Sequence, residues 1–256
     1  MAKTIAIVNQ KGGVGKTTTA INLAASLALA EKDILLVDTD PQGNSTSGLG
    51  INRQEVRKSL YDAYAGRCTT DEAVVQTSIQ HLEVIPSTVD LLGVEVELVG
   101  REGREHILSQ IIAGLEEKYK YILIDCPPSL GLLCLNALVA ADSVIVPVQC
   151  EYYALEGLSL LTRTLQRVRN SFNPSLEIRG ILLTMFDTRN SLSHQVAQEV
   201  KHHFGEKVFD TVIPRNVALA EAPSHGKPIM LYDVRSSGAQ SYLSLAKEIL
   251  GENGSR

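Results

Sequence analysis

The residues best suited to chemistry in this chain lie in a glycine-rich loop near its beginning. Residues 10–17 read Gln-Lys-Gly-Gly-Val-Gly-Lys-Thr, directly after the apolar run 5–8 and directly before the helical stretch 18–30. A strand, a glycine turn and a helix start in this order direct backbone N–H groups at one point, which favours a bound phosphate. Lys16 can reach the outer phosphates, and the Thr17 hydroxyl can bind the accompanying magnesium. The sequence therefore predicts a nucleoside triphosphate site.

This loop departs from the standard phosphate-binding pattern at two positions. The pattern has glycine where this chain has Gln10, and it does not require the second lysine, Lys11. A lysine at that place is well positioned to leave its own phosphate site and serve another. We assign nucleotide binding to the whole run that follows Gln10, namely Lys11, Gly12, Gly13, Val14, Gly15, Lys16, Thr17 and Thr18.

An aspartate at the end of a second apolar run fits a magnesium site. Asp125 follows the run 121–124, and a carboxylate there is costly unless it binds a cation or a donor. We expect it to hold magnesium through a water beside Thr17. The alternative is a turn aspartate ahead of Pro127.

Two further carboxylates, Asp38 and Asp40, follow the apolar run 34–37. One of them should face the γ-phosphate and orient or deprotonate the attacking water. We favour Asp40, as catalytic residue and as part of the metal site, because it begins a loop with Pro41 and Gly43 that can close over the phosphate. The role of Asp38, which can also support the magnesium shell, stays open.

The elements that position these residues alternate along the chain. Short apolar runs predict strands at 4–8, 34–37, 82–85, 121–124, 143–148, 178–185 and 208–213. Helical patterns lie at 17–30, 89–99, 105–118, 131–140, 155–170, 193–204 and 238–250. This order predicts an α/β fold, a doubly wound and mostly parallel sheet of about seven to eight strands flanked by helices. Its ligands should bind at the carboxyl ends of the strands.

Composition is that of an ordinary globular protein. The 256 residues are 44% apolar and 21% charged, with a net charge of −5, and we expect residues 1–256 to form a single domain. The four cysteines have no Cys-x-x-Cys spacing, so we expect reduced thiols in a cytoplasmic protein rather than a zinc or disulfide framework. No segment reads as a secretory signal or a membrane span.

Several motifs in register resemble the ParA/Soj family of chromosome- and plasmid-partitioning ATPases, within the deviant Walker group that includes MinD and the nitrogenase iron protein. They are K-G-G-V-G-K-T-T, V-D-T-D-P-Q-G-N, I-D-C-P-P-S-L-G, P-V-Q-C-E-Y-Y-A-L-E-G at 147–157, and V-I-P-R-N-V-A-L-A-E-A-P-S-H-G-K-P-I at 212–229. The resemblance covers nearly the whole chain.

The resemblance implies an ATP- and Mg²⁺-dependent hydrolase, weak alone and stimulated by a partner. It implies a homodimer that encloses ATP, in which Lys11 reaches the nucleotide of the partner subunit while Lys16 stays on its own. It also places Pro214 and Asn216 at the adenine, and Met185 at the end of the preceding strand can contact the base too.

The same resemblance implies partners and a location. A basic surface of the ATP dimer binds double-stranded DNA without sequence preference, and Arg189 and Arg215 match positions that the family uses for DNA. The first strand begins at once, so we expect no N-terminal operator-binding domain. The family works with a ParB/Spo0J-type centromere-binding protein, which makes the protein cytoplasmic and nucleoid-associated. Glu151 is either an interface residue or a structural carboxylate.

Three alternatives have less support in the residues. A MinD-like membrane-associated positioning ATPase needs a basic amphipathic C-terminal helix, whereas residues 243–256 have no cluster of basic and bulky aromatic side chains. An iron–sulfur carrier needs cysteines at a shared dimer face, and Cys126 and Cys134 do not match that spacing. A plain kinase has no evident acceptor site. We therefore expect no membrane partner.

Overall fold

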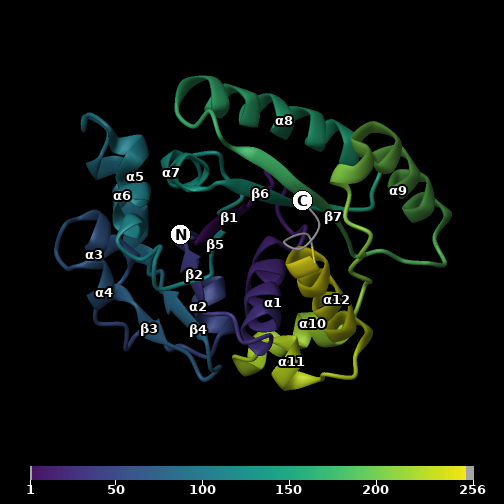
Figure 1. The fold of residues 1–256 in the computed structure, drawn as a ribbon, viewed down its shortest axis with the longest axis horizontal. Coiled ribbons are helices and arrows are strands. Elements are labelled where there is room, and N and C mark those ends of the chain that lie inside the picture. The colour runs from purple at the N-terminus through teal and green to yellow at the C-terminus, as the bar shows by residue number, and fades with distance from the viewer. Residues whose placement is uncertain (1, 252–256) are drawn as a thin grey trace.

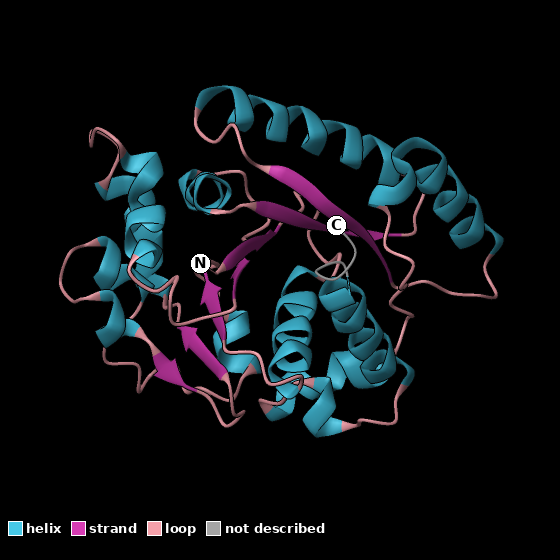
Figure 2. Cartoon of the chain, in the orientation of Figure 1, coloured by secondary structure: helices cyan, strands magenta, loops and turns pink. Residues whose placement is uncertain are grey.

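The computed structural model describes residues 2–251, and its centre is one sheet of seven strands (Figures 1 and 2). The strand order is β3-β4-β2-β5-β1-β6-β7, and every neighbouring pair is parallel except β3 with β4. The strands are β1 (Lys3–Ile7), β2 (Ile34–Asp38), β3 (Val75–Gln76), β4 (Leu82–Ile85), β5 (Tyr121–Asp125), β6 (Ser143–Gln149) and β7 (Glu177–Thr184). The predicted α/β fold with a mostly parallel sheet is confirmed.

Helices cover both faces of the sheet. One face carries α1 (Lys16–Leu29), α10 (Val217–Glu221), α11 (Ile229–Tyr232) and α12 (Ser237–Gly251). The other carries α3 (Leu60–Tyr64), α4 (Thr70–Ala73), α5 (Leu92–Glu97), α6 (Ile107–Ala113), α7 (Leu132–Ala140), α8 (Ala154–Ser171) and α9 (Ser191–Phe204). The short α2 (Asn44–Gly48) follows β2. Among residues 2–251 no helix has both the length and the apolar character needed to cross a bilayer.

Apolar side chains at consecutive strand positions explain the two-sided burial. All five residues of β2 are buried. Ile34 and Leu36 belong to the core beneath α1 and α12, while Leu35 and Val37 belong to the core beneath α6 and α7. A central parallel strand needs apolar side chains on both faces, because helices pack on both.

The carboxyl ends of the parallel strands meet at one edge of the sheet, which brings the predicted site residues together. Asp38 at the end of β2 is in register with Asp125 at the end of β5, and Asp125 is in register with Ile7 at the end of β1. The loops after these strands therefore open on the same side as the glycine loop, as predicted.

The predicted strand at 208–213 is wrong. Only isolated bridges join this segment to the sheet edge, at Val208 and at Pro214. Between them, the backbone amides of Asp210 and Thr211 donate to the carboxylate of Glu248 on α12, at 2.8 and 3.1 Å. The amides of Phe209 and Ile213 do donate to β7, at the carbonyls of Ile181 and Leu183. The stretch between them bonds to the Glu248 side chain instead, so a continuous ladder with β7 does not form. The seventh strand is instead the two-residue β3.

Two predicted helices are shorter than their patterns. The segment 89–99 forms a 3₁₀ turn, Val89–Leu91, and then α5. The segment 105–118 begins with the 3₁₀ turn Arg104–His106 and continues as α6, which ends at Ala113 ahead of Gly114. Glycine is a poor helix former because it loses much backbone entropy in a helix, and the residues after it form turns.

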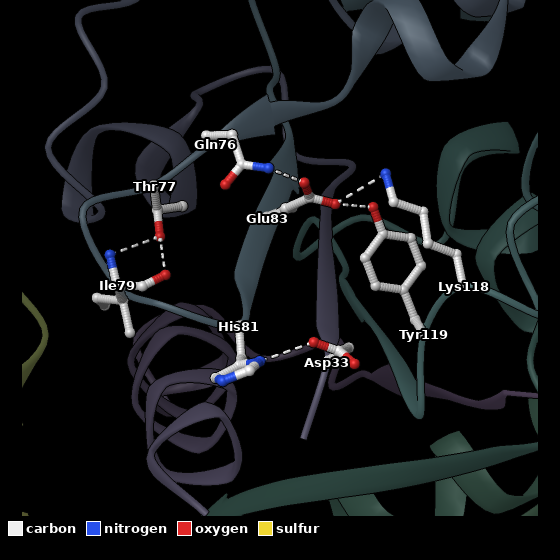
Figure 3. A network of polar contacts seen from close by, with 8 residues as sticks. All are labelled: Asp33, Gln76, Thr77, Ile79, His81, Glu83, Lys118 and Tyr119. Carbon is white, nitrogen blue, oxygen red and sulfur yellow. Dashed lines mark hydrogen bonds and ion pairs between the residues drawn. The ribbon is translucent and has the colours of Figure 1, made fainter. Parts of the chain in front are cut away.

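A polar network ties down the opposite edge of the sheet, far from the glycine loop (Figure 3). Glu83 on β4 accepts hydrogen bonds from Gln76 on β3 and from the Tyr119 hydroxyl, and Lys118 Nζ lies 3.1 Å from the same carboxylate. The residues ahead of β5 are thereby joined to the antiparallel β3–β4 pair. This network is structural and makes no contact with the candidate site.

Candidate functional site

The glycine loop between β1 and α1 has the backbone shape of a phosphate cradle. Gly13 and Gly15 have φ values of 74° and 89°, a region that disfavours residues with a Cβ atom, and Gly15 precedes the first residue of α1. Side chains fix the loop from both sides. Asn9 accepts from Lys11 N at 3.0 Å, and the Thr184 hydroxyl donates to the Val14 carbonyl at 2.8 Å.

A cavity of about 520 Å³ lies in front of this loop. It brings together eight residues that the sequence predicted for the site: Gly12, Gly13, Gly15, Lys16, Thr17, Thr18, Asp40 and Met185. Val14 is buried behind the loop, and the Lys11 side chain points to another partner. The size and the lining suit the phosphate chain of a nucleotide at the N-terminus of α1.

Lys16 is the buried cation of this cavity. Its Nζ atom donates to the carbonyl of Lys11 at 3.2 Å, which arches the side chain over the loop. Burial lowers the pKa of Lys16, and the negative charges of Asp125 and Asp40 act against that decrease. A bound anion stabilises a buried ammonium close to a helix N-terminus, so this site favours the binding of a phosphate group.

Asp125 has an unsatisfied oxygen at the place where a metal ion is expected. Its Oδ2 atom accepts from the Ser45 hydroxyl at 2.7 Å, whereas its Oδ1 atom is buried without a hydrogen-bond partner. Burial, and then the charge of Asp38, raise the pKa of Asp125 to about 7, and the hydrogen bond from Ser45 opposes the increase. A divalent cation beside Thr17 and Asp125 removes this desolvation cost, so the residues fit Mg²⁺.

Protein side chains alone do not complete a metal site here. No group of three or more His, Cys, Asp or Glu residues that could hold an ion occurs within residues 2–251. Magnesium commonly keeps several waters and binds through one or two carboxylates plus substrate phosphates. One carboxylate (Asp125) and one hydroxyl (Thr17) next to a phosphate-binding loop match this mode of Mg²⁺ coordination.

Asp38 and Asp40 occupy different environments. Asp38 is fully buried, and its Oδ2 atom accepts from both the amide and the hydroxyl of Thr46, at 2.8 and 2.7 Å. Burial raises the pKa of Asp38, and the Thr46 hydrogen bonds oppose the increase. Asp40 instead lines the phosphate cavity and holds the amide of Gln42 at 2.9 Å. Asp38 therefore anchors the loop after β2, and Asp40 is the carboxylate available to a ligand.

Lys11 is held by an acidic partner on the neighbouring loop. Its Nζ atom lies 2.6 Å from Glu151 Oε2, with both side chains about half exposed. Gln149, at the end of β6, donates to the other oxygen of Glu151. The two lysines of the glycine loop thus differ, because Lys16 faces the cavity and Lys11 faces the loop after β6.

A second cavity, of about 190 Å³, adjoins the first and contains the predicted base-binding residues. Pro214 and Asn216 line it, and it shares Gly15, Thr18 and Met185 with the phosphate cavity. Met185 has a φ of 50°, which is unusual for a residue with a side chain and marks local strain at the end of β7. The arrangement suits a planar apolar group attached to the phosphate chain.

The two predicted DNA-binding arginines lie on neighbouring segments. Arg215 N donates to the Phe186 carbonyl at 3.1 Å, which places 215 beside the loop after β7. Arg189 on that loop is exposed and makes two hydrogen bonds of 3.0 Å to Asp187. Hydrogen bonds from Arg189 lower the pKa of Asp187 to about 2, and the charge of Arg215 contributes to the decrease.

Sequence reasoning missed several residues of the site. Ser45 and Thr46 of α2 donate hydrogen bonds to Asp125 and Asp38, respectively. The only feature of the sequence that could have indicated these roles is their position shortly after Asp40. Leu92 and Glu95 of α5 line the phosphate cavity from a segment that had no chemical signal. Pro41 belongs to the loop that was predicted to close over the phosphate, and the remaining lining residues, which were missed, also follow β2 and β5: Gln42, Asn44, Pro127, Pro128, Ser129 and Leu133.

Comparison with known proteins links this geometry to a family. The family described as "AAA domain" matches residues 2–178. The chain is 56% identical to the sporulation initiation inhibitor protein Soj of Bacillus subtilis, over 97% of this chain and 98% of that protein. It is 55% identical to the chromosome partitioning protein ParA of Myxococcus xanthus, over 98% of this chain and 88% of that protein.

A solved structure shares both the fold and a nucleotide. The cobyrinic acid a,c-diamide synthase of Mycobacterium smegmatis, with bound ADP and magnesium, superposes with a TM-score of 0.87. It is 35% identical, and the match covers 100% of this chain and 96% of that one. The scaffold described above is therefore one that holds a nucleotide with magnesium in a related protein.

Proposed function

Because this chain belongs to the ParA/Soj family of chromosome-partitioning ATPases, we propose that it hydrolyses ATP as an ATP-enclosing homodimer that binds DNA. ATP and Mg²⁺ are its cofactors. The observation that carries the proposal is the pairing of a glycine cradle with the orphaned Oδ1 atom of Asp125. Fold likeness by itself does not define a function, so the proposal depends on this site.

Different residues of the chain have different roles in phosphoryl transfer. The N–H groups of residues 12–18 and the Lys16 ammonium bind the phosphates. Thr17 and Asp125 would hold Mg²⁺, which would supply positive charge to offset the negative charge that develops on the phosphates. Asp40 lies in the cavity wall and orients the attacking water. Lys16 remains on its own nucleotide throughout.

The second lysine completes the site from another subunit. In the single chain Lys11 is paired with Glu151. In the proposed dimer it moves to the nucleotide of the partner subunit, where its charge stabilises the transferring phosphoryl group, as an arginine finger does. This requirement makes hydrolysis weak in isolated chains and makes dimerisation dependent on ATP.

DNA binding follows from dimerisation. Arg189 and Arg215 lie on adjacent segments and contact phosphates, without base readout. Two subunits double the number of such contacts, so ATP controls DNA affinity through the oligomeric state. A ParB/Spo0J-type centromere-binding protein stimulates hydrolysis and releases the DNA. The protein acts in the cytoplasm, on the nucleoid.

One experiment tests the proposal as a whole. Molar mass and DNA binding are measured with ADP, with ATP, and with ATP on an Asp40→Ala background that binds nucleotide without turning it over. We expect a monomer with ADP and a DNA-binding dimer with ATP, most persistent in the Asp40→Ala protein. Arg189→Ala should reduce the salt slope of log affinity by about 2 per dimer, one phosphate contact per subunit. A monomer in every nucleotide state contradicts the proposal.

A further inference from the structure

A third cavity, which we call the α1–α2 cavity, lies beside the two cavities described above. Its volume is about 430 Å³, and it lies between α1, α2 and the 3₁₀ turn Ala222–His225. That turn follows α10, and α1, α2, α10 and α11 pack together in this part of the molecule (Figure 1). The lining residues are Thr17, Thr18, Ile21, Asn22, Asn44, Ser47, Ala222, Pro223, Ser224 and Lys227.

The three cavities meet at Thr18. This residue lines the phosphate cavity, the cavity with Pro214 and Asn216, and the α1–α2 cavity. In the proposed binding mode the base lies in one of the first two cavities and the phosphates lie in the other. The ribose links the base to the phosphates, so it must pass Thr18. Its 2′- and 3′-hydroxyl groups can therefore point into the α1–α2 cavity.

The charge of the α1–α2 cavity favours an anion. Lys227 is the one charged residue among those that line it, and no carboxylate lines it. Within residues 2–251 the Lys227 ammonium makes no hydrogen bond or ion pair, and the side chains of Thr18 and Asn44 make no hydrogen bond either. A phosphate monoester carries about −1.5 to −2 charges at pH 7 and accepts hydrogen bonds from such donors.

The turn that carries Lys227 is fixed on two sides. Gly226 has a φ of 59°, and a Cβ atom there would lie 2.7 Å from the Cα of Gly50, so the backbone of the turn packs directly against the residue that follows Leu49 after α2. On the other side, the Asn22 side chain of α1 accepts from the Ile229 amide at 2.8 Å. Because the backbone around Lys227 is already ordered, a ligand does not have to order it.

We propose that the α1–α2 cavity binds a phosphate group attached to the ribose of the nucleotide. The chain then recognises a class of nucleotide that is phosphorylated at the 2′- or 3′-hydroxyl as well as at the 5′ end. Lys227 supplies the ion pair, and Thr18 and Asn44 supply hydrogen bonds. The inference rests on the nucleotide binding in the proposed function, and it adds a second anion subsite. A nucleotide of this class competes with ATP for the same protein.

The test compares nucleotides that differ by one phosphate group. Binding of ADP, of ADP with an additional 3′-phosphate and of ADP with an additional 2′-phosphate is measured by titration calorimetry, with Mg²⁺ and at low ionic strength, where screening is weak. The proteins are the wild type, Lys227→Ala, Lys227→Arg and the control Lys207→Ala. Lys207 is also an exposed lysine on a 3₁₀ turn, and it lines none of the three cavities.

We expect at least one of the two isomers to bind the wild type and Lys207→Ala at least about tenfold more tightly than ADP does, because it adds a charge-assisted contact. This gain should fall below about twofold in Lys227→Ala and should largely remain in Lys227→Arg, which keeps the positive charge. The affinity for ADP itself should stay within about twofold in all four proteins, which also shows that each variant is folded.

The possible failures are distinguishable. If neither isomer binds the wild type more tightly than ADP, the inference is overturned and the proposed function is unaffected. A gain that persists in Lys227→Ala also overturns it, even where that variant has lost affinity for DNA, because the phosphate then lies elsewhere. A wild-type protein that binds no ADP contradicts the proposed function and the inference together.

A second variant keeps the test decisive if Lys227→Ala does not bind ADP. Lys227→Gln removes the charge and keeps most of the length of the side chain, so it disturbs the packing of the turn less. We expect ADP binding within about twofold of the wild type and a gain below about threefold for either isomer. An unchanged gain in Lys227→Gln overturns the inference.

Discussion

Lys11 Nζ and Glu151 Oε2 lie 2.6 Å apart, and this contact joins the glycine loop to the loop after β6 within one chain. The pair is about half exposed, and Gln149 supports the glutamate from behind. Exposed ion pairs contribute little to stability, because water and salt screen them. The contact therefore holds Lys11 reversibly, and in the proposed dimer a nucleotide on the second subunit can compete for it.

Removal of the charge on Glu151 should favour the dimer. Glu151→Gln keeps the shape of the side chain but no longer attracts Lys11, so the lysine is free to engage a partner. We expect dimerisation with ATP at roughly two- to fivefold lower protein concentration, measured by sedimentation or light scattering. Glu156→Gln, an exposed glutamate in the first turn of α8, is the control. A weaker dimer for Glu151→Gln contradicts the idea that Glu151 restrains Lys11.

Asp125→Asn should remove the effect of magnesium on nucleotide binding. The amide oxygen of asparagine can still accept from Ser45, but the uncharged group is a poor ligand for Mg²⁺. We expect the gain in ATP affinity on adding Mg²⁺ to fall by at least about tenfold, as measured by titration calorimetry with Mg²⁺ and with a chelator. Equal gains in the two proteins remove Asp125 from the metal site.

The buried carboxyl pair gives the nucleotide-free protein a characteristic pH dependence. Burial raises the pKa of both Asp38 and Asp125, so the folded chain binds more protons than the unfolded chain above about pH 4. The contribution of these groups to stability is then fully present at low pH and is lost as the pH rises through about 7.

We expect the denaturant midpoint of the wild-type protein to fall, relative to Asp125→Asn, between pH 5 and pH 8. Addition of ATP with Mg²⁺ should remove this difference in slope, because the bound cation favours the ionised carboxylate. Parallel pH profiles for the two nucleotide-free proteins contradict the assignment of the slope to Asp125.

A substitution at Glu83 should lower the stability of the protein without changing its affinity for ATP. Glu83→Gln removes the charge that accepts from Gln76 and Tyr119 and that pairs with Lys118 (Figure 3). We expect a loss of about 1–3 kcal/mol in the free energy of unfolding, measured in denaturant, because the mostly buried side chain at position 83 can then no longer satisfy all of these donors. ATP affinity should stay unchanged, since the network lies at the opposite edge of the sheet. A large loss of ATP affinity in Glu83→Gln contradicts the prediction that this network does not affect nucleotide binding.

Local patterns in the sequence determined the scaffold and the phosphate cradle. Runs such as 34–37 and 121–124 are apolar at every position, as expected for strands buried on both faces. The loop at 10–17 needs glycine at positions with positive φ and a helix directly after it. Residues that are adjacent in the sequence meet both conditions. Information of this kind is local, so it can be recognised without knowledge of the fold.

Tertiary structure alone decided what depends on a distant partner. The segment 208–213 has the composition of a strand, yet the Glu248 side chain on α12 accepts from the amides of Asp210 and Thr211 and interrupts its pairing with β7. Asp38 and Asp40 are alike in sequence, and Thr46 makes the first an anchor while the second stays in the cavity wall. The contact of Lys11 with Glu151 joins residues 140 positions apart. Hydrogen-bond competition and burial are set by the packed neighbours, and the order of residues does not specify them locally.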